Sequence, residues 1–283
     1  MLKKCLFPGA GYGTRFLPAT KSMPKEMLPV VNKPLIHYGV EEALEAGLTE
    51  ITIVNGRNKE AIPNYFDTSY ELESYIKDSD AEKHLDGIRR ITEACVFSYV
   101  RQKAMRGLGD AVLTGETLIG NQPFAVVLAD DICLNQGKGV LQQLTELFLH
   151  RPLCIVAVEE VEPEQVSQYG IIDGEPIDSF DGNAVFQVNA MLEKPSIEDA
   201  PSRLAAIGRY ILLPEIFPLL KTLSATGSGE LQLTSALNLL AKIGKVLAYR
   251  FHGKRFDCGR PEGFVAATNH FYQLYKNNSA AFV

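Results

Sequence analysis

A glycine-rich segment near the start of the chain has the residue types that hold phosphate groups. Residues 9–15 read Gly-Ala-Gly-Tyr-Gly-Thr-Arg and follow the apolar run Leu2–Phe7, which predicts a first β-strand. Glycine lets the backbone approach a ligand closely and turn through positive φ, so that N–H groups can face phosphate oxygens. Arg15 adds a planar cation suited to those oxygens, and Lys21 and Lys25 follow. The pattern predicts a nucleotide-binding site.

Two common nucleotide-binding motifs do not fit this segment. The dinucleotide fingerprint Gly-x-Gly-x-x-Gly, counted from Gly9, requires a glycine where the chain has Thr14. The loop Gly-x-x-x-x-Gly-Lys-Ser/Thr fails because Thr14, Arg15 and Phe16 stand at its second glycine, its lysine and its hydroxyl residue. The alternative is a loop that is rich in glycine only because it turns tightly. The adjoining Thr-Arg and Lys-Glu-Met-Leu-Pro sequences weigh against that alternative.

The glycine-rich segment and the residues after it resemble a known family. Residues 9–15 and the sequence Pro-Lys-Glu-Met-Leu-Pro at 24–29 are similar to the opening of the bacterial UTP–glucose-1-phosphate uridylyltransferases, within the sugar-nucleotide pyrophosphorylase family. Further similar segments follow in the family's order at 66–73, 100–102, 107–112, 128–131, 169–173, 193–195, 208–210 and 257–259. Each segment alone is a weak signal, but their common order makes the resemblance specific.

The resemblance implies transfer of a uridylyl group from UTP to glucose 1-phosphate, which gives UDP-glucose and pyrophosphate. The sugar phosphate attacks the α-phosphorus in line, so the protein must hold two polyanions together and stabilise the charge that develops. The implied catalytic cations are Arg15 and Lys25 on the leaving pyrophosphate, and Lys194 on the sugar phosphate. Mg²⁺ is the implied cofactor, since repelling phosphates call for a metal.

Two aspartates are the implied metal ligands. Asp130 directly follows the apolar run Phe124–Ala129, at the carboxyl end of an expected strand, and magnesium needs only one or two protein carboxylates beside phosphate oxygens. Neighbours on a strand point to opposite faces, so at most one of Asp130 and Asp131 should face the ligand. The resemblance selects Asp130 and leaves Asp131 as a supporting or surface residue. Asp257 is the second implied ligand, with a structural turn aspartate as the alternative.

The sugar half of the site is expected around residues 170 and 193–194. The resemblance implies that Glu193 accepts hydrogen bonds from glucose hydroxyls, and that Gly170 lets the backbone approach the sugar ring. An extended chain would point Glu193 and Lys194 to opposite sides, so the chain must twist here to present both. Pro195 restricts the residue before it to extended conformations and helps to end the strand.

The nucleoside half is expected around the glycine-rich segment and residues 102–107. The amide of Gln102 offers a donor and an acceptor that match one edge of uracil, and backbone N–H groups at Gly107 can do the same. The resemblance places the remaining nucleotide-binding residues on the nucleoside and phosphates, with Glu26 hydrogen-bonded near the nucleoside. These residues are Ala10, Gly11, Gly13, Thr14 and Glu26.

Composition narrows the class of protein. The chain of 283 residues has 28 Lys and Arg against 34 Asp and Glu, a net charge of −6, so its overall charge predicts neither nucleic-acid nor membrane binding. The five cysteines are widely spaced and form no zinc-like pair, which favours reduced thiols in a cytoplasmic protein. No apolar stretch reaches the length of a membrane span. Similar enzymes are often homo-oligomers, and we expect the same here from resemblance alone.

The elements that must position these residues alternate along the chain. Apolar runs predict strands at 2–7, 50–54, 95–100, 124–129, 153–158, 185–192, 206–212 and 245–251. Between them, helical patterns cover 34–46 (with Asn32 as its cap and Gly47 as its stop), 107–118 and 139–149. Surface helices are expected within 70–90, and an amphipathic helix at 262–276. This order predicts an α/β fold: a Rossmann-like, doubly wound, mixed but mostly parallel sheet flanked by helices, with ligands at the carboxyl ends of its strands.

We expect one nucleotidyltransferase domain of the GT-A-like kind over residues 1–283, since no linker or repeat divides the chain. Residues 1–158 should form mainly the nucleotide-binding half and residues 159–260 the sugar-binding half. Turn signals between 161 and 183 predict antiparallel strands in the second half. Residues 261–283 should form the C-terminal helix.

Two other functions stay open. A glucose-1-phosphate thymidylyltransferase typically reads Lys-Gln-Leu-Leu-Pro where this chain has residues 25–29, which favours uridylyl transfer, yet the two bases differ by one methyl group, worth roughly 1–3 kcal/mol. The other is a non-catalytic paralogue that binds sugar nucleotides and regulates an active enzyme. The presence of Arg15, Lys25, Asp130 and Lys194 together argues against the paralogue.

Overall fold

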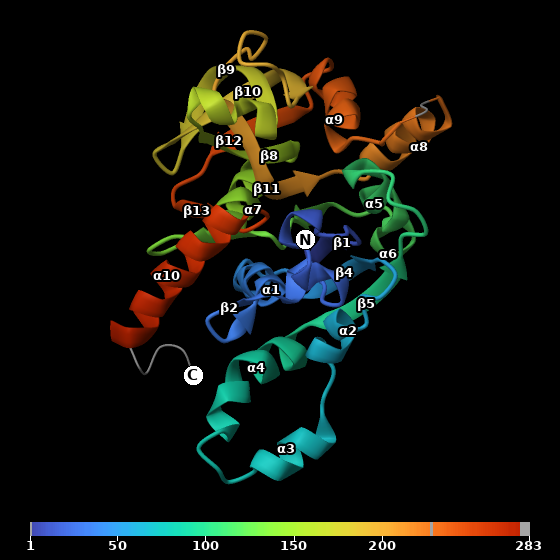
Figure 1. Ribbon diagram of the computed structural model, residues 1–283. Helices are drawn as coiled ribbons and strands as arrows, with labels where there is room; N and C mark the ends of the chain where they lie inside the picture. Colours follow the sequence, from blue (N-terminus) through green and yellow to red (C-terminus); the bar gives the residue numbers. More distant parts are fainter. Residues whose placement is uncertain (1, 227–228, 278–283) are drawn as a thin grey trace.

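A central sheet organises the protein in the computed structural model, which describes residues 2–226 and 229–277. Within those residues the main sheet has nine strands in the order β5-β4-β1-β6-β11-β8-β12-β10-β9 (Figure 1). Helices cover both of its faces, and two buried apolar clusters lie on either side of it. Cys5 and Phe7 of β1 belong to one cluster and Leu6 to the other, as the alternation of side chains along a strand requires.

The first four strands are parallel, as predicted. They are β5 (Val96–Arg101), β4 (Glu50–Asn55), β1 (Lys4–Gly9) and β6 (Phe124–Val127). Each of the three pairings between neighbours runs parallel, so the carboxyl ends of these strands meet at one edge. The loops after β1 and β6, which carry the glycine-rich segment and Asp130, therefore leave the sheet side by side.

The second half of the sheet is mainly antiparallel, so the prediction of a mostly parallel sheet is correct only for the first half. Its strands are β11 (Leu204–Leu212), β8 (Cys154–Glu160), β12 (Val246–Arg250), β10 (Asn183–Glu193) and β9 (Gly170–Phe180). Among their pairings only β8 with β12 is parallel. One of these antiparallel pairs is the long β9–β10 hairpin, whose turn at residues 181–182 reverses the chain without a crossover helix.

A small ribbon beside the main sheet joins two distant parts of the chain. Strand β7 (Asp131–Leu134) pairs antiparallel with β13 (Lys254–Asp257), and the pairing places Asp131 opposite Asp257. A second ribbon pairs β2 (Pro29–Val30) with β3 (Lys33–Pro34). The β7–β13 ribbon is not evident from the sequence pattern, and it is what brings the two predicted metal ligands into the same region.

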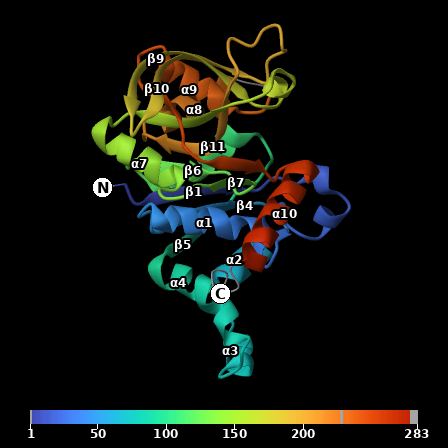
Figure 2. The same ribbon diagram turned by 90° about the vertical axis from the view of Figure 1, so that its left-hand side faces the viewer.

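Helices pack on the sheet in two groups. Helices α1 (Leu35–Glu45), α2 (Ala61–Phe66), α4 (Asp86–Ala94) and α7 (Val140–His150) contribute to one cluster, and α5 (Leu108–Thr114), α6 (Glu116–Ile119), α8 (Ile216–Thr226) and α9 (Leu233–Ala241) to the other. Helix α10 (Pro261–Asn277) contacts β2 and β13, and α3 (Tyr70–Ile76) extends away from the sheet (Figure 2). Residues 278–283, at the end of the predicted C-terminal helix, lie outside the described residues.

Helix boundaries differ from the predictions in two places. Helix α1 begins after Pro34, which is its N-cap, so the assignment of Asn32 as the cap is wrong; Gly47, with a φ of +79°, ends the helix as expected. The helix predicted over 107–118 is two helices, α5 and α6, which Gly115 separates. Gly107, with a φ of +95°, precedes α5 as predicted.

Candidate active site

Two cavities meet at Asp130, at the edge where β1 and β6 end. The first, of about 310 Å³, is lined by Ala10, Gly11, Lys25, Gln102 and Gly107, all from the predicted nucleotide half. The second, of about 260 Å³, is lined by Arg15, Gly170, Glu193, Lys194 and Asp257, which belong mostly to the predicted sugar half. Leu108, Leu128 and Asp130 line both cavities. The structure thus brings most of the predicted site residues to one cleft with two compartments.

The glycine-rich segment packs against Lys25. Gly13 has a φ of +66°, and a Cβ added there would lie 2.9 Å from Cβ of Lys25, so a larger residue does not fit without a shift. Gly13 and Thr14 line neither cavity, and the Thr14 side chain is exposed to solvent. Arg15 points toward the second cavity, where its Nη1 lies 3.4 Å from the carbonyl oxygen of Gly259.

Lys25 and Asp130 form an ion pair at the junction of the two cavities. The Nζ of Lys25 lies 2.5 Å from Oδ2 of Asp130, and both side chains are partly buried. Burial would raise the pKa of Asp130, but the adjacent ammonium of Lys25 holds it below its usual value. Burial likewise opposes the charge on Lys25, and Asp130 and Glu26 raise its pKa. Both groups are therefore charged at neutral pH, as a phosphate site with a metal requires.

Glu26, the residue after Lys25, is fully buried and lines neither cavity. Its Oε2 accepts a hydrogen bond of 2.6 Å from Lys59, while its Oε1 is buried without a hydrogen-bond partner. Burial raises the pKa of Glu26 and lowers that of Lys59, which shows how strongly this ion pair is desolvated. Sequence reasoning missed Lys59, because a lone lysine in a loop after a strand carries no motif. The predicted contact of Glu26 with the nucleoside stays a prediction.

Gln102 and Gly107 form one wall of the first cavity. The amide Nε2 of Gln102 donates a hydrogen bond of 2.7 Å to Oδ2 of Asp110, which Arg106 contacts in turn at 2.9 Å. This bond fixes the plane of the buried amide in the cavity wall. Gly107 tolerates no side chain, since an added Cβ would lie 2.6 Å from the carbonyl oxygen of Leu231.

The second cavity presents both Glu193 and Lys194, as expected from a twist of the chain. The twist is a φ of +47° at Lys194, so the expectation that Pro195 keeps this residue extended is wrong. A hydrogen bond of 3.0 Å from the Lys194 N–H to the Tyr169 carbonyl oxygen stabilises the turned backbone. The hydroxyl of Thr234 donates to Oε2 of Glu193 at 3.2 Å, a contact that the sequence does not reveal.

Asp257 faces Asp130 across Gly259. A Cβ added to Gly259 would lie 2.9 Å from Oδ2 of Asp130 and 3.1 Å from Oδ1 of Asp257, so the two carboxylates flank the same small space. No group of three or more His, Cys, Asp and Glu side chains suited to a metal occurs in residues 2–226 and 229–277. Two hard carboxylates beside lysine and arginine nonetheless fit magnesium, which takes its remaining ligands from phosphate and water.

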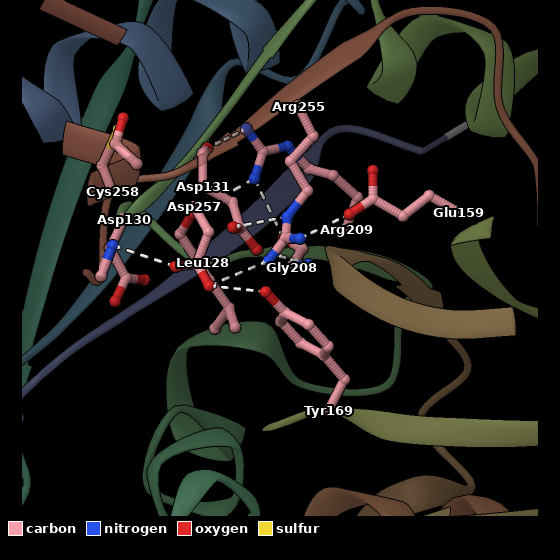
Figure 3. Close-up of polar contacts among 12 residues, drawn as sticks. Leu128, Asp130, Asp131, Glu159, Tyr169, Gly208, Arg209, Arg255, Asp257 and Cys258 are labelled. Carbon is pink, nitrogen blue, oxygen red and sulfur yellow. Dashed lines mark hydrogen bonds and ion pairs between the residues drawn. The ribbon is translucent and has the colours of Figure 1, made fainter. Parts of the chain in front are cut away.

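Arg255 is the centre of the charge network behind Asp257 (Figure 3). Its guanidinium contacts Asp131 at 2.7 Å, Glu159 at 2.5 Å and Asp257 at 3.6 Å. Burial alone would lower the pKa of Arg255, but the surrounding carboxylates raise it far above its ordinary value. The period of two along β13 puts Arg255 and Asp257 on one face, which is the signal that could have found this residue.

Asp131 supports this network rather than lying on the surface. It is buried, and its carboxylate accepts hydrogen bonds from Arg255 and from the Gly208 N–H, at 2.7 and 2.9 Å. The rule of alternating strand neighbours does not apply, because β6 ends at Val127 and both aspartates line the second cavity.

A second buried arginine holds the chain on both sides of Asp130. Arg209 is fully buried and donates to the carbonyl oxygens of Leu128 at 3.2 Å and Asp131 at 2.8 Å (Figure 3). Its charge is balanced by Glu42, whose Oε2 lies 3.0 and 2.8 Å from Nε and Nη2. Arg209 thereby sets the position of the loop that carries Asp130.

A family model, curated sequences and solved structures all show similarity of this chain to nucleotidyl transferases. The model of the nucleotidyl transferase family matches residues 7–273. A curated relative, the UTP–glucose-1-phosphate uridylyltransferase of Pseudomonas aeruginosa, is 58% identical over 99% of this chain and 100% of its own. The crystal structure of an apo UDP-glucose pyrophosphorylase is similar at a TM-score of 0.92 and 55% identity, over 97% of this chain and 99% of that one.

A structure of a UDP-glucose pyrophosphorylase complexed with UDP-glucose is also similar. Its TM-score is 0.87 at 54% identity, and the likeness covers 97% of this chain and 100% of that one.

Within the described residues, no helix is both long and apolar enough to cross a bilayer.

Proposed function

The chain belongs to the nucleotidyl transferase family, among the UTP–glucose-1-phosphate uridylyltransferases, and we propose that it performs their reaction in the cleft at Asp130. It transfers a uridylyl group from UTP to glucose 1-phosphate and yields UDP-glucose and pyrophosphate. The observation that carries the proposal is the meeting of two cavities at the Lys25–Asp130 pair, because a transfer between two phosphorylated substrates needs them side by side.

The first cavity holds UTP in this proposal. The amide of Gln102 and the backbone at Gly107 meet the uracil edge, and Ala10 and Gly11 lie against the nucleoside. Gly13 and Thr14 support the phosphate-binding backbone from outside the cavity. The negative charge of Glu26 favours the charged form of Lys25. The fixed amide plane of Gln102 favours one pattern of base donors and acceptors, which suits a pyrimidine with an N3–H and two carbonyl groups.

The second cavity holds glucose 1-phosphate. The carboxylate of Glu193, oriented by Thr234, accepts hydrogen bonds from sugar hydroxyls. Gly170 lines the same cavity and lets the backbone approach the ring, and a Cβ there would crowd Thr234 at 3.1 Å and Glu193 at 3.6 Å. Lys194, on the same cavity wall, neutralises the sugar phosphate.

Catalysis in this arrangement is positioning and charge stabilisation. Lys194 holds the attacking phosphate oxygen, while Lys25 on the first cavity stabilises the charge that builds up on the departing pyrophosphate. Arg15 lines the second cavity, so it can take part in this role only where the triphosphate extends past Asp130. Lys25 lines the first cavity and pairs with Asp130, which lines both cavities, so its ammonium lies close to the place where the two substrates would meet. No side chain needs to form a covalent bond to substrate.

Magnesium completes the site in this proposal, held by Asp130 and Asp257. A bound divalent cation supplies neutralising charge to phosphate oxygens. Asp130 would share its carboxylate between such a cation and Lys25, whose ammonium lies 2.5 Å from it. Arg255 and Tyr169 keep Asp257 in place.

We further propose that residues 1–283 act as one nucleotidyltransferase domain that assembles as a homo-oligomer in the cytoplasm. The main sheet continues from the nucleotide half into the sugar half through the β6–β11 pairing, which supports one unit. All five cysteines are free thiols, which supports a reducing compartment.

The experiment is pyrophosphate release from glucose 1-phosphate with UTP, dTTP, ATP, GTP or CTP, each with and without magnesium. Protein from a host that lacks its own uridylyltransferase removes background activity. Release largely confined to UTP and dependent on magnesium is expected. A preference for dTTP would make the chain a thymidylyltransferase, and binding of UDP-glucose with no release from any nucleotide would make it a regulatory paralogue.

A further inference from the structure

Tyr169 connects the sugar-binding segment at Lys194 to Asp257 and Arg255 through three separate contacts, all at the second cavity. It stands immediately before Gly170, which opens β9. Its carbonyl oxygen accepts the Lys194 N–H at 3.0 Å, which holds the turned backbone of the sugar-binding segment. Its hydroxyl donates to Oδ2 of Asp257 at 2.8 Å, across 88 residues of sequence.

The ring of Tyr169 supplies the third contact. The Arg255 guanidinium lies over it, 4.8 Å from the ring centroid, a cation–π geometry. Arg255 also contacts Asp257 and Asp131. The Tyr169 ring therefore links these charged side chains to the start of β9. Figure 3 shows the Tyr169 hydroxyl pointing directly at Asp257.

The hydroxyl decides which oxygen of Asp257 is left for a ligand. Oδ2 is held by Tyr169, with Arg255 and Arg260 at 3.6 and 3.7 Å. Oδ1 accepts the Gly259 N–H at 3.1 Å and faces Asp130 across that glycine. Without the hydroxyl, Oδ2 of Asp257 would keep only the two arginines at ion-pair distance, and the Gly259 N–H would be the one hydrogen-bond donor left to the carboxylate within the described residues.

We infer that Tyr169 is a positioning residue for the cation: its hydroxyl fixes Asp257 so that Oδ1 is presented toward Asp130, while its backbone anchors Lys194. The inference rests on the proposed function, in which Asp130 and Asp257 hold the metal. Residues that hydrogen-bond a metal ligand commonly change metal affinity by about 10–100-fold when they are removed. Tyr169 therefore ties the placement of the cation to the conformation of the segment that binds the sugar.

The test compares Tyr169→Phe with Tyr249→Phe in the full chain. Tyr169→Phe keeps the ring, the stack with Arg255 and the backbone contact, and removes only the hydroxyl. Tyr249 lies on β12 outside both cavities, and its hydroxyl accepts a hydrogen bond of 3.1 Å from the Asn183 amide and donates one of 3.4 Å to the Phe180 carbonyl oxygen. The control therefore also removes a part-buried, hydrogen-bonded phenol hydroxyl, but one that lies away from the cleft and contacts no charged group among the described residues.

Two binding measurements are made on each protein. Electron paramagnetic resonance of free Mn²⁺ gives the affinity for that cation in the presence of saturating UDP-glucose, and calorimetry in EDTA gives the affinity for UDP-glucose without metal. For Tyr169→Phe we expect Mn²⁺ to bind about tenfold more weakly and UDP-glucose without metal to bind within about twofold of the unmodified chain. Tyr249→Phe should match the unmodified chain in both measurements.

Unchanged Mn²⁺ binding by Tyr169→Phe would overturn the inference, as would an equal loss in both measurements, which would assign the hydroxyl to sugar binding alone. Failure of the unmodified chain to bind Mn²⁺ would also overturn it. Pyrophosphate release by the unmodified chain is measured in parallel. Its absence would refute the proposed function, while the Mn²⁺ comparison would still report on Tyr169.

Discussion

Replacement of Arg209 by methionine tests whether one buried ion pair supports the loop that carries Asp130. Arg209 is fully buried, and its guanidinium makes two hydrogen bonds to Glu42, at 3.0 and 2.8 Å. It also donates to the carbonyl oxygens of Leu128, Gly208 and Asp131. Methionine fills much of the same volume but leaves Glu42 buried without its counter-charge.

The magnitude follows from the burial of both partners. Removing one member of a buried ion pair costs about 3–5 kcal/mol, mainly because the remaining charge is uncompensated. Glu42 keeps one donor, the Leu141 N–H at 2.9 Å, which lowers this cost only in part. We therefore expect Arg209→Met to lower the free energy of unfolding by about 3 kcal/mol. The double variant with Glu42→Leu should lose less than the sum of the two single variants, since no bare charge remains.

The assay is urea denaturation followed by far-ultraviolet circular dichroism, since the chain has no tryptophan. Turnover under native conditions is measured on the same proteins. A release of the Asp130 loop should lower kcat in Arg209→Met even where the protein is fully folded. A loss of stability below about 1 kcal/mol, or strictly additive effects in the double variant, would refute the reasoning about an uncompensated charge.

Three further predictions concern single side chains. Asp130→Ala should abolish magnesium-dependent turnover with an unchanged circular dichroism spectrum, and near-normal activity would exclude Asp130 as a metal ligand. Lys194→Ala should lower kcat/KM for glucose 1-phosphate by roughly 10–100-fold through the loss of charge-assisted contacts, with KM for UTP little changed; a selective rise in KM for UTP would show that the assignment to the sugar side is wrong. Burial would raise the pKa of Glu41, but His37 and Lys33 help to lower it from 4.5 to about 2. The stabilising effect of this carboxylate is therefore fully present above pH 4.5 and is lost as the pH falls toward 2. Glu41→Gln should lower the free energy of unfolding by about 1 kcal/mol at pH 7, and by less as the pH falls through that window. A difference in urea midpoint between the two proteins that stays constant with pH would contradict this.

Local features of the fold are well predicted from the sequence. Continuous apolar runs placed every strand of the main sheet except β9 within a few residues, because burial leaves a strong composition signal. Gly47 and Gly107 marked helix ends correctly, since both adopt positive φ that other residues avoid. Sequence patterns did not identify α8 and α9, although α9 supplies Thr234 to the second cavity.

Contacts between distant segments were beyond the sequence pattern. Nothing in the sequence pattern indicates that the four-residue strands β7 and β13 pair, yet their pairing puts Asp131 opposite Asp257. The Arg209–Glu42 pair spans 167 residues, and each partner alone resembles an ordinary surface charge. The positive φ of Lys194 depends on the Tyr169 carbonyl, a tertiary contact that overrides the usual restriction before proline.

The most direct test of the central claim is a crystal structure of the chain with UDP-glucose and Mn²⁺, with the metal located by its anomalous scattering. The account predicts uracil against Gln102 and Gly107, glucose against Glu193, and one Mn²⁺ peak between Asp130 and Asp257. Uracil in the second cavity, or a Mn²⁺ peak distant from both aspartates, would contradict it.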